Sequence, residues 1–124
     1  MKILLIEDNR PNREMISRRL VRHGYQVITA VDGLEGIEMV RTTQPDLVLL
    51  DMGLPGLDGW QVAERIRANP ETGSLPVIAL TAHVIVGDRE RALASGCDDY
   101  EPKPVDFDRL LEKIRNLLER RGPA

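Results

Sequence analysis

The chain has 124 residues, a net charge of −3 and a single cysteine. This length fits one domain with a sizeable core, and the apolar fraction of 42% excludes a disordered chain. The mild negative charge, without a basic stripe, argues against direct nucleic-acid binding. No apolar run is long enough to cross a bilayer or to serve as a signal peptide. We therefore expect one cytoplasmic domain over residues 1–124, with no output domain and no membrane contact.

Apolar runs without polar alternation mark the expected strands, because a parallel strand is covered on both faces. Strands are expected at residues 2–7, 25–30, 47–50 and 76–81, with a short edge strand at 97–100. Helical spacing fills the intervals, with helices expected at residues 10–23, from 32 to before 45, at 58–69, 88–95 and 106–120. Five strands alternating with five helices predict an α/β fold, a parallel sheet wrapped on both faces by right-handed crossovers.

Two aspartates mark where helices begin. Asp32 and Asp58 each precede a helical segment and are natural N-caps. In the first of these segments Leu34, Ile37 and Val40 recur at helical spacing, which indicates one apolar face, and Gly36 among them indicates a close approach of helix to sheet.

Four of the five expected strands end on polar residues of definite kinds. Glu7 and Asp8 follow the first, Asp51 the third, Thr81 the fourth and Lys103 the fifth. Parallel strands finish at the same edge of a sheet, so these groups should meet in one crevice. Clustered carboxylates repel one another unless a hard cation such as Mg²⁺ lies among them. An aspartate can also attack phosphorus to form an acyl phosphate, and an ammonium and a hydroxyl can position phosphoryl oxygens.

Over essentially its whole length the chain closely resembles the receiver domain of bacterial two-component response regulators. The resemblance lies in Glu7-Asp8, the segment LLDMGLPGLDG around Asp51, LTA at residues 80–82, Tyr100, and Lys103-Pro104, with matching spacing. It implies a flavodoxin-like (βα)5 sheet of strand order 2-1-3-4-5, the order found in the stand-alone regulator CheY.

The resemblance also assigns roles around the acids. Asp51 would be the phosphoacceptor; Asp8, Asp51 and the main-chain carbonyl of Gly53 would bind Mg²⁺, with Glu7 acting through a water. Glu7 stands where many members have aspartate, and its longer arm should still reach such a water. Gly53 stands where many members have a side chain. With His83 it would flank the line along which water attacks the phosphoryl group, and the lifetime of that group is left open.

Three further residues would complete the site. Lys103 would pair with the phosphate, aimed by a cis peptide bond to Pro104, and Thr81 would hydrogen-bond the phosphate. Tyr100 would rotate inward as Thr81 moves. These residues imply a switch between two states whose populations the phosphate biases.

The implied partners are proteins. The phosphoryl group would come from a histidine kinase or a histidine phosphotransfer protein, docked on the helix at residues 10–23 and steered by Arg18, Arg19 and Arg22. The signal would leave by contact with a target protein, through residues 84–86 and the neighbouring helix, or by onward transfer. Self-phosphorylation and autodephosphorylation would occur without making the chain a turnover enzyme. We expect a monomer or a weak dimer.

Three alternatives compete with this interpretation. A haloacid-dehalogenase-type phosphatase needs a second aspartate two residues after its nucleophile, where this chain has Gly53. A flavodoxin-like electron carrier needs a phosphate-binding loop after the first strand, where the acids at residues 7 and 8 would repel phosphate. A degenerate receiver that serves only as a scaffold would not need the intact acid, threonine and lysine set.

Overall fold

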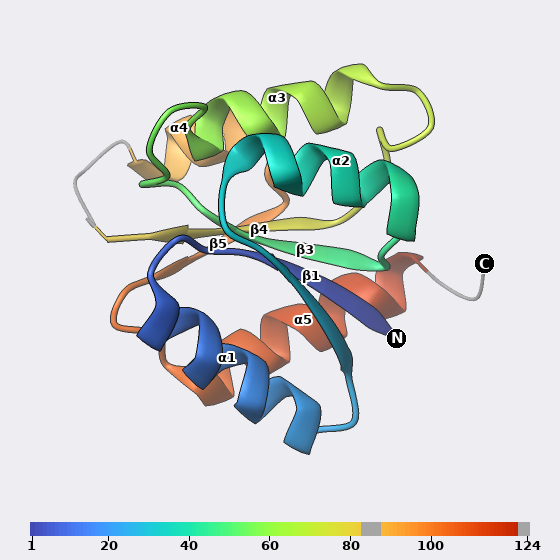
Figure 1. Ribbon diagram of the computed structural model, residues 1–124. Helices are drawn as coiled ribbons and strands as arrows, with labels where there is room; N and C mark the ends of the chain where they lie inside the picture. The colour runs from blue at the N-terminus through green and yellow to red at the C-terminus, as the bar shows by residue number, and fades with distance from the viewer. Residues whose placement is uncertain (83–87, 122–124) are drawn as a thin grey trace.

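The computed structural model describes residues 1–82 and 88–121. In chain order its elements are β1 (Lys2–Ile6), α1 (Arg10–Arg22), β2 (Gln26–Ala30), α2 (Gly33–Thr43), β3 (Leu47–Asp51), α3 (Gly59–Ala68), β4 (Val77–Thr81), α4 (Asp88–Ala94), β5 (Asp99–Pro102) and α5 (Phe107–Arg121). The five strands form one parallel sheet in the predicted order, β2-β1-β3-β4-β5. Helices α1 and α5 cover one face, and α2, α3 and α4 cover the other (Figure 1).

The sheet separates two apolar clusters. Strand β3, the apolar run LVLLD, is buried along its whole length, as expected for a central strand covered on both faces. Its alternate residues enter opposite clusters: Leu47 and Leu49 pack with α1 and α5, whereas Val48 and Leu50 pack with α2 and α3. Among the described residues, no helix has the length and apolar character needed to span a bilayer.

The helix starts confirm both predicted caps. The carboxylate of Asp32 accepts the N–H of Glu35 at 2.8 Å, and that of Asp58 accepts the N–H of Gln61 at 3.0 Å. The side chain of Gln61 in turn accepts the N–H of Asp58 at 3.2 Å, which completes a capping box.

Helix α2 confirms one prediction and corrects another. Gly36 does approach the sheet, since a Cβ built on it would lie 2.4 Å from Cδ1 of Ile6. Ile37 and Val40 pack on the core as their spacing indicates, but the prediction is wrong for Leu34, which is 66% exposed. The buried face runs instead through Gly33, Gly36 and Val40. Gly36 brings the helix backbone onto Ile6 of β1, and Gly33 packs closely against Leu57 and Val62, so the face that carries both glycines points inward and Leu34 points outward.

Strand β5 lies two residues later than predicted. Its register with β4 pairs Ile78 with Asp99 and Thr81 with Pro102. Pro102, the last residue of the strand, has no N–H to donate. On an edge strand that loss is tolerated, since one side of the strand has no neighbour. The shift places Glu101 inside the sheet rather than in the following loop.

At the amino end of the strands, Arg67 of α3 joins three segments. Its guanidinium donates to the carbonyl oxygens of Gly96 at 2.6 Å, Gly73 at 3.1 Å and Leu75 at 2.5 Å. It also pairs with the carboxylate of Asp98, which accepts the N–H of Val77 at 2.8 Å. The loops that precede β4 and β5 are thereby fixed to α3.

Helices α3 and α4 are joined by a cation–π contact. The guanidinium carbon of Arg91 lies 4.2 Å from the ring centroid of Trp60. Trp60 itself is half-buried and packs against the core cluster beneath α3.

Candidate functional site

Three acids meet at the carboxyl edge of the sheet, as the strand ends predict. One carboxylate oxygen from each of Glu7, Asp8 and Asp51 lies within 4.8 Å of the others. Glu7 continues the pairing of β1 beyond its last residue, since its N–H donates to the carbonyl of Ala30 at 3.0 Å. Glu7 and Asp51 are buried, whereas Asp8 is exposed. The cluster therefore opens to solvent on the side of Asp8.

Lys103 reaches the same cluster from the loop after β5. Its ammonium lies 3.1 Å from Oδ1 of Asp51 and 3.2 Å from Oε2 of Glu7. Its peptide N–H donates to the carbonyl of Thr81 at 2.7 Å, which ties the ends of β4 and β5 together. The peptide bond between Lys103 and Pro104 is cis, as the resemblance implied.

The electrostatics of the cluster show an excess of negative charge. Burial raises the pKa of Glu7 and the charge of Asp51 raises it further, while Lys103 lowers it without reversing the net rise. Burial alone would lower the pKa of Lys103, but the carboxylates of Asp51 and Glu7 outweigh it and the pKa is raised. One ammonium thus serves two buried carboxylates, and the exposed Asp8 adds a third negative charge. Such a set fits a hard divalent cation.

Gly53 and Thr81 lie beside the cluster. The N–H of Gly53 donates to Oδ1 of Asp51 at 3.0 Å, so this oxygen already accepts from both the backbone and Lys103. A Cβ on Gly53 would lie 3.6 Å from the same oxygen, which is an ordinary contact, so a side chain would fit there. Thr81 is buried at the end of β4, where Leu80 pairs with Asp51. His83 lies outside the described residues.

Tyr100 lies on β5 and is half-buried. Its side chain packs against the core cluster beneath α2 and α3, and the ammonium of Lys113 lies 5.1 Å from its ring centroid. Its inward rotation remains a prediction, as does a target surface at residues 84–86, which lie outside the described residues.

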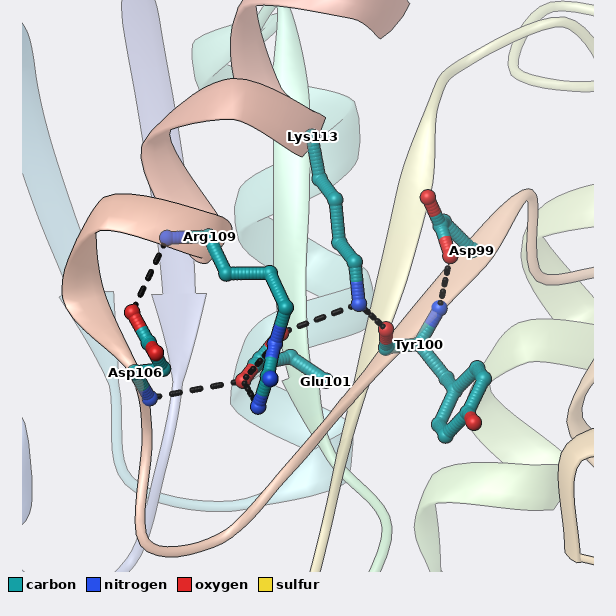
Figure 2. Close-up of polar contacts among 6 residues, drawn as sticks. All are labelled: Asp99, Tyr100, Glu101, Asp106, Arg109 and Lys113. Atoms are coloured by element: carbon teal, nitrogen blue, oxygen red, sulfur yellow. Dashed lines mark hydrogen bonds and ion pairs between the residues drawn. The ribbon is translucent and has the colours of Figure 1, made fainter.

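Glu101, a second buried glutamate, was missed by the sequence analysis. Its side chain is fully buried on the α5 side of β5, where its carboxylate accepts from Arg109 and Lys113 of α5 (Figure 2). Arg109 and Lys113 are four residues apart, a spacing that places both cations on one face of a helix. That pair of charges beside an apolar face was the signal that could have identified a buried acid on the neighbouring strand.

A groove of about 500 Å³ runs alongside Lys103. It lies between α1 and the loop after β5, and it is lined by Asn12, Met15, Ile16, Arg19, Lys103, Pro104 and Val105. Arg18 and Arg22 are exposed farther along α1. The groove thus lies between α1 and Lys103, whose ammonium contacts the acidic cluster.

Comparison with known proteins places these features in one family. The model of the response regulator receiver domain matches residues 3–115. Response regulator MprA of Mycobacterium leprae is 42% identical over 123 residues, which cover 99% of this chain and 53% of that protein. The chain spans about half the length of the curated relatives it matches.

Two solved structures show the same architecture. The receiver domain of sensor histidine kinase PA1611 from Pseudomonas aeruginosa, with a magnesium ion coordinated in its active site cleft, aligns with a TM-score of 0.88 and 36% identity, covering 95% of this chain and 97% of that one. A chain from the co-crystal structure of the Saccharomyces cerevisiae histidine phosphotransfer protein Ypd1 with the receiver domain of Ssk1 aligns with a TM-score of 0.91 and 28% identity, covering 99% and 92%.

The sheet order and the acidic cluster define a signal-transduction domain of the two-component type. The chain belongs to the response regulator receiver domain family. This is the family that the sequence resemblance indicated, rather than the phosphatase or the electron carrier considered beside it.

Proposed function

We propose that this receiver domain accepts a phosphoryl group on Asp51 from a histidine kinase or a histidine phosphotransfer protein. The position of Asp51 supports this role most directly. Its carboxylate is buried at the end of the central strand, and Oδ1 lies 3.1 Å from the Lys103 ammonium and 3.0 Å from the N–H of Gly53. A carboxylate held in this way is oriented for attack and has a cation beside the charge that develops.

In the transfer, a carboxylate oxygen of Asp51 attacks the phosphorus of a phosphoimidazole. The new P–O bond forms as the P–N bond breaks, and the imidazole nitrogen keeps the electron pair and takes up a proton. Lys103 pairs with a phosphoryl oxygen and the Thr81 hydroxyl donates to another. Water later attacks the phosphorus and releases phosphate, which restores the carboxylate. The aspartate itself is phosphorylated, so the domain is a phosphoacceptor and not a turnover enzyme.

The acidic cluster fits Mg²⁺. Asp8, Asp51 and the carbonyl of Gly53 would hold it, with Glu7 acting through a water, and the ion would neutralise the charge on the transferred group. The grouping of three carboxylate oxygens within 4.8 Å supports this assignment, as does the raised pKa of Glu7.

Labelling by a small phosphodonor tests the phosphoacceptor. With acetyl phosphate and Mg²⁺, the wild type should take up one phosphoryl group, and Asp51→Asn should abolish the labelling. Asp58→Asn is the matched control, because it makes the same change at a helix cap where asparagine caps as well as aspartate. Undiminished, acid-stable labelling of Asp51→Asn would contradict the proposal.

The groove beside Lys103 would dock the phosphodonor protein. It offers a partly apolar surface next to the reacting carboxylate, and Arg18 and Arg22 add positive charge on the same helix. Reversing both arginines to glutamate should slow transfer from the kinase while labelling by acetyl phosphate stays unchanged. Arg41→Glu with Arg65→Glu makes an equal charge change on α2 and α3, the helices that cover the other face of the sheet (Figure 1), and should slow neither transfer nor labelling. Equal losses in both assays for the α1 variant would point to damage of the site itself.

The phosphorylated form would signal through α4 and β5 to a target protein, or pass the group onward. Beryllofluoride, which mimics an aspartyl phosphate, should shift NMR signals of residues 81–104 more than those of α2 when Mg²⁺ is present. A response confined to residues at the acidic cluster would contradict a switch of this kind.

A further inference from the structure

The loop that carries Lys103 is held at both ends. At its start, the Lys103 N–H donates to the carbonyl of Thr81 at 2.7 Å. At its end, the N–H of Asp106 donates to Oε2 of Glu101 at 3.3 Å (Figure 2). Glu101 lies two residues before Lys103, so its carboxylate closes the loop back onto the strand from which it leaves.

The same carboxylate is joined to the first turn of α5. Arg109 donates to it from Nε at 3.0 and 3.1 Å and from Nη2 at 2.8 Å. The backbone N–H of Arg109 also donates to Oδ1 of Asp106 at 3.1 Å. The loop end, the helix start and the Glu101 carboxylate therefore form one hydrogen-bonded unit.

Lys113 extends this unit by one helical turn. Its ammonium donates to Oε1 of Glu101 at 2.9 Å and to the main-chain carbonyl of Tyr100. Figure 2 shows it between the strand and the helix, on the side of the carboxylate opposite to Asp106. Strand β5 is thus fixed against α5 immediately before the residues that lead to Lys103.

Stability alone does not account for this arrangement. The Glu101 side chain is fully buried, and apolar residues of similar volume often replace buried ion pairs without loss of stability. What an ion network adds is a defined geometry, because each hydrogen bond fixes direction as well as distance. Here the geometry that it defines is that of the Lys103 loop.

We propose that Glu101 is a positioning residue for Lys103: held by Arg109 and Lys113, its carboxylate sets the path of the loop and keeps the Lys103 ammonium at Asp51. The proposal rests on the proposed function of Asp51 and Lys103. It adds Glu101 of β5, which does not itself touch the acidic cluster.

The test replaces the ion pair by an apolar pair. Glu101→Leu with Lys113→Met removes the carboxylate without leaving a buried ammonium, and Arg109, whose side chain is half exposed, can turn to water. Urea unfolding should show wild-type stability for this double variant. Its affinity for beryllofluoride with Mg²⁺, measured by ¹⁹F NMR, should fall about tenfold, which is within the range of coupling between neighbouring residues. Glu101→Gln, which keeps the shape, should show a smaller loss in the same direction.

A double-mutant cycle separates positioning from general structural damage. In the Lys103→Met background the apolar pair should cause no further loss of affinity, because the residue through which it acts is absent. Arg67→Met is the matched control. It removes an ion pair at the opposite end of the strands and should lower stability without changing affinity. Unchanged affinity in the double variant, or an equal loss with and without Lys103, would overturn the proposal.

A second readout needs no phosphate mimic. The ¹⁵N signal of the Lys103 ammonium should be slow to exchange with water in the wild type and fast in the apolar double variant. If the wild type did not bind beryllofluoride, the proposed function would fail, and this signal would still decide whether Glu101 positions Lys103. Slow exchange in both proteins would overturn the positioning role.

Discussion

Two glutamates in this domain are equally buried and behave in opposite ways. Glu7 and Glu101 each have 0% exposure, and each accepts a hydrogen bond from a lysine ammonium. Burial favours the neutral form of both. Nevertheless the pKa of Glu7 is raised, whereas the pKa of Glu101 lies below its ordinary value of 4.5.

The difference comes from their partners. Burial alone would raise the pKa of Glu101, but hydrogen bonds from Arg109 and Lys113 outweigh it. Glu7 must share the ammonium of Lys103 with Asp51, whose negative charge opposes its own ionisation. At Glu101 the chain supplies its own cations, whereas at Glu7 it leaves negative charge uncompensated. Uncompensated charge of this kind is what a site for an external cation requires.

The largest expected difference appears when each glutamate is removed alone. Glu101→Leu leaves the largely buried Lys113 ammonium without its carboxylate and should lower the free energy of unfolding by about 3 kcal/mol. Glu7→Leu leaves Lys103 still paired with Asp51, so it should change the free energy of unfolding by no more than about 1 kcal/mol. Urea unfolding without Mg²⁺ measures both. Equal losses would mean that the two glutamates do not differ in this way.

Stabilisation by Mg²⁺ should depend on the acidic cluster that contains Glu7 and not on Glu101. At about 100 times its dissociation constant, Mg²⁺ should stabilise the wild type by about 2.7 kcal/mol. Asp8→Asn should remove most of this gain, because Asp8 is the exposed acid of the cluster. Glu101→Gln should retain the gain in full, although its metal-free stability is lower. Thermal unfolding with and without Mg²⁺ measures this gain in stability for each protein. If Asp8→Asn kept the full gain, Mg²⁺ would not bind at the acidic cluster.

A smaller effect should follow pH. Because the folded pKa of Glu101 lies below 4.5, its ionised form contributes stability that is fully present above about pH 4.5 and is lost as the pH falls through the folded value. Its carboxylate is faced by Arg109, Lys113 and the N–H of Asp106. The stability difference between wild type and Glu101→Gln should therefore be constant from pH 7 to about 5 and shrink below that. If the stability difference between wild type and Glu101→Gln grew as the pH fell, it would contradict a lowered pKa for Glu101.

The sequence predicted the sheet and the cluster at its edge well, for a local reason. Buried parallel strands are continuous apolar runs, and the runs of β3 and β4 end on Asp51 and Thr81 at this edge. Caps such as Asp58 act within three residues of themselves. Topology then brings Glu7, Asp51 and Lys103 to one edge, because all parallel strands finish there.

Glu101 could not be predicted in the same way. Its burial depends on Arg109 and Lys113, which lie eight and twelve residues later and reach it only after α5 has packed on the sheet. A glutamate before Pro102 is locally an ordinary loop residue. The exposure of Leu34 likewise depends on how closely Gly36 of α2 approaches β1. In both cases packing between elements decided the outcome.

The contact between Arg91 and Trp60 gives the molecule a built-in optical probe. Trp60 is the sole tryptophan of the chain, and the cation over its ring comes from α4 rather than from its own helix. The emission of an indole depends on the charges beside it, so movement of α4 away from α3 would change the intrinsic fluorescence. The position of this helix can thus be followed in solution, in real time and without any attached dye.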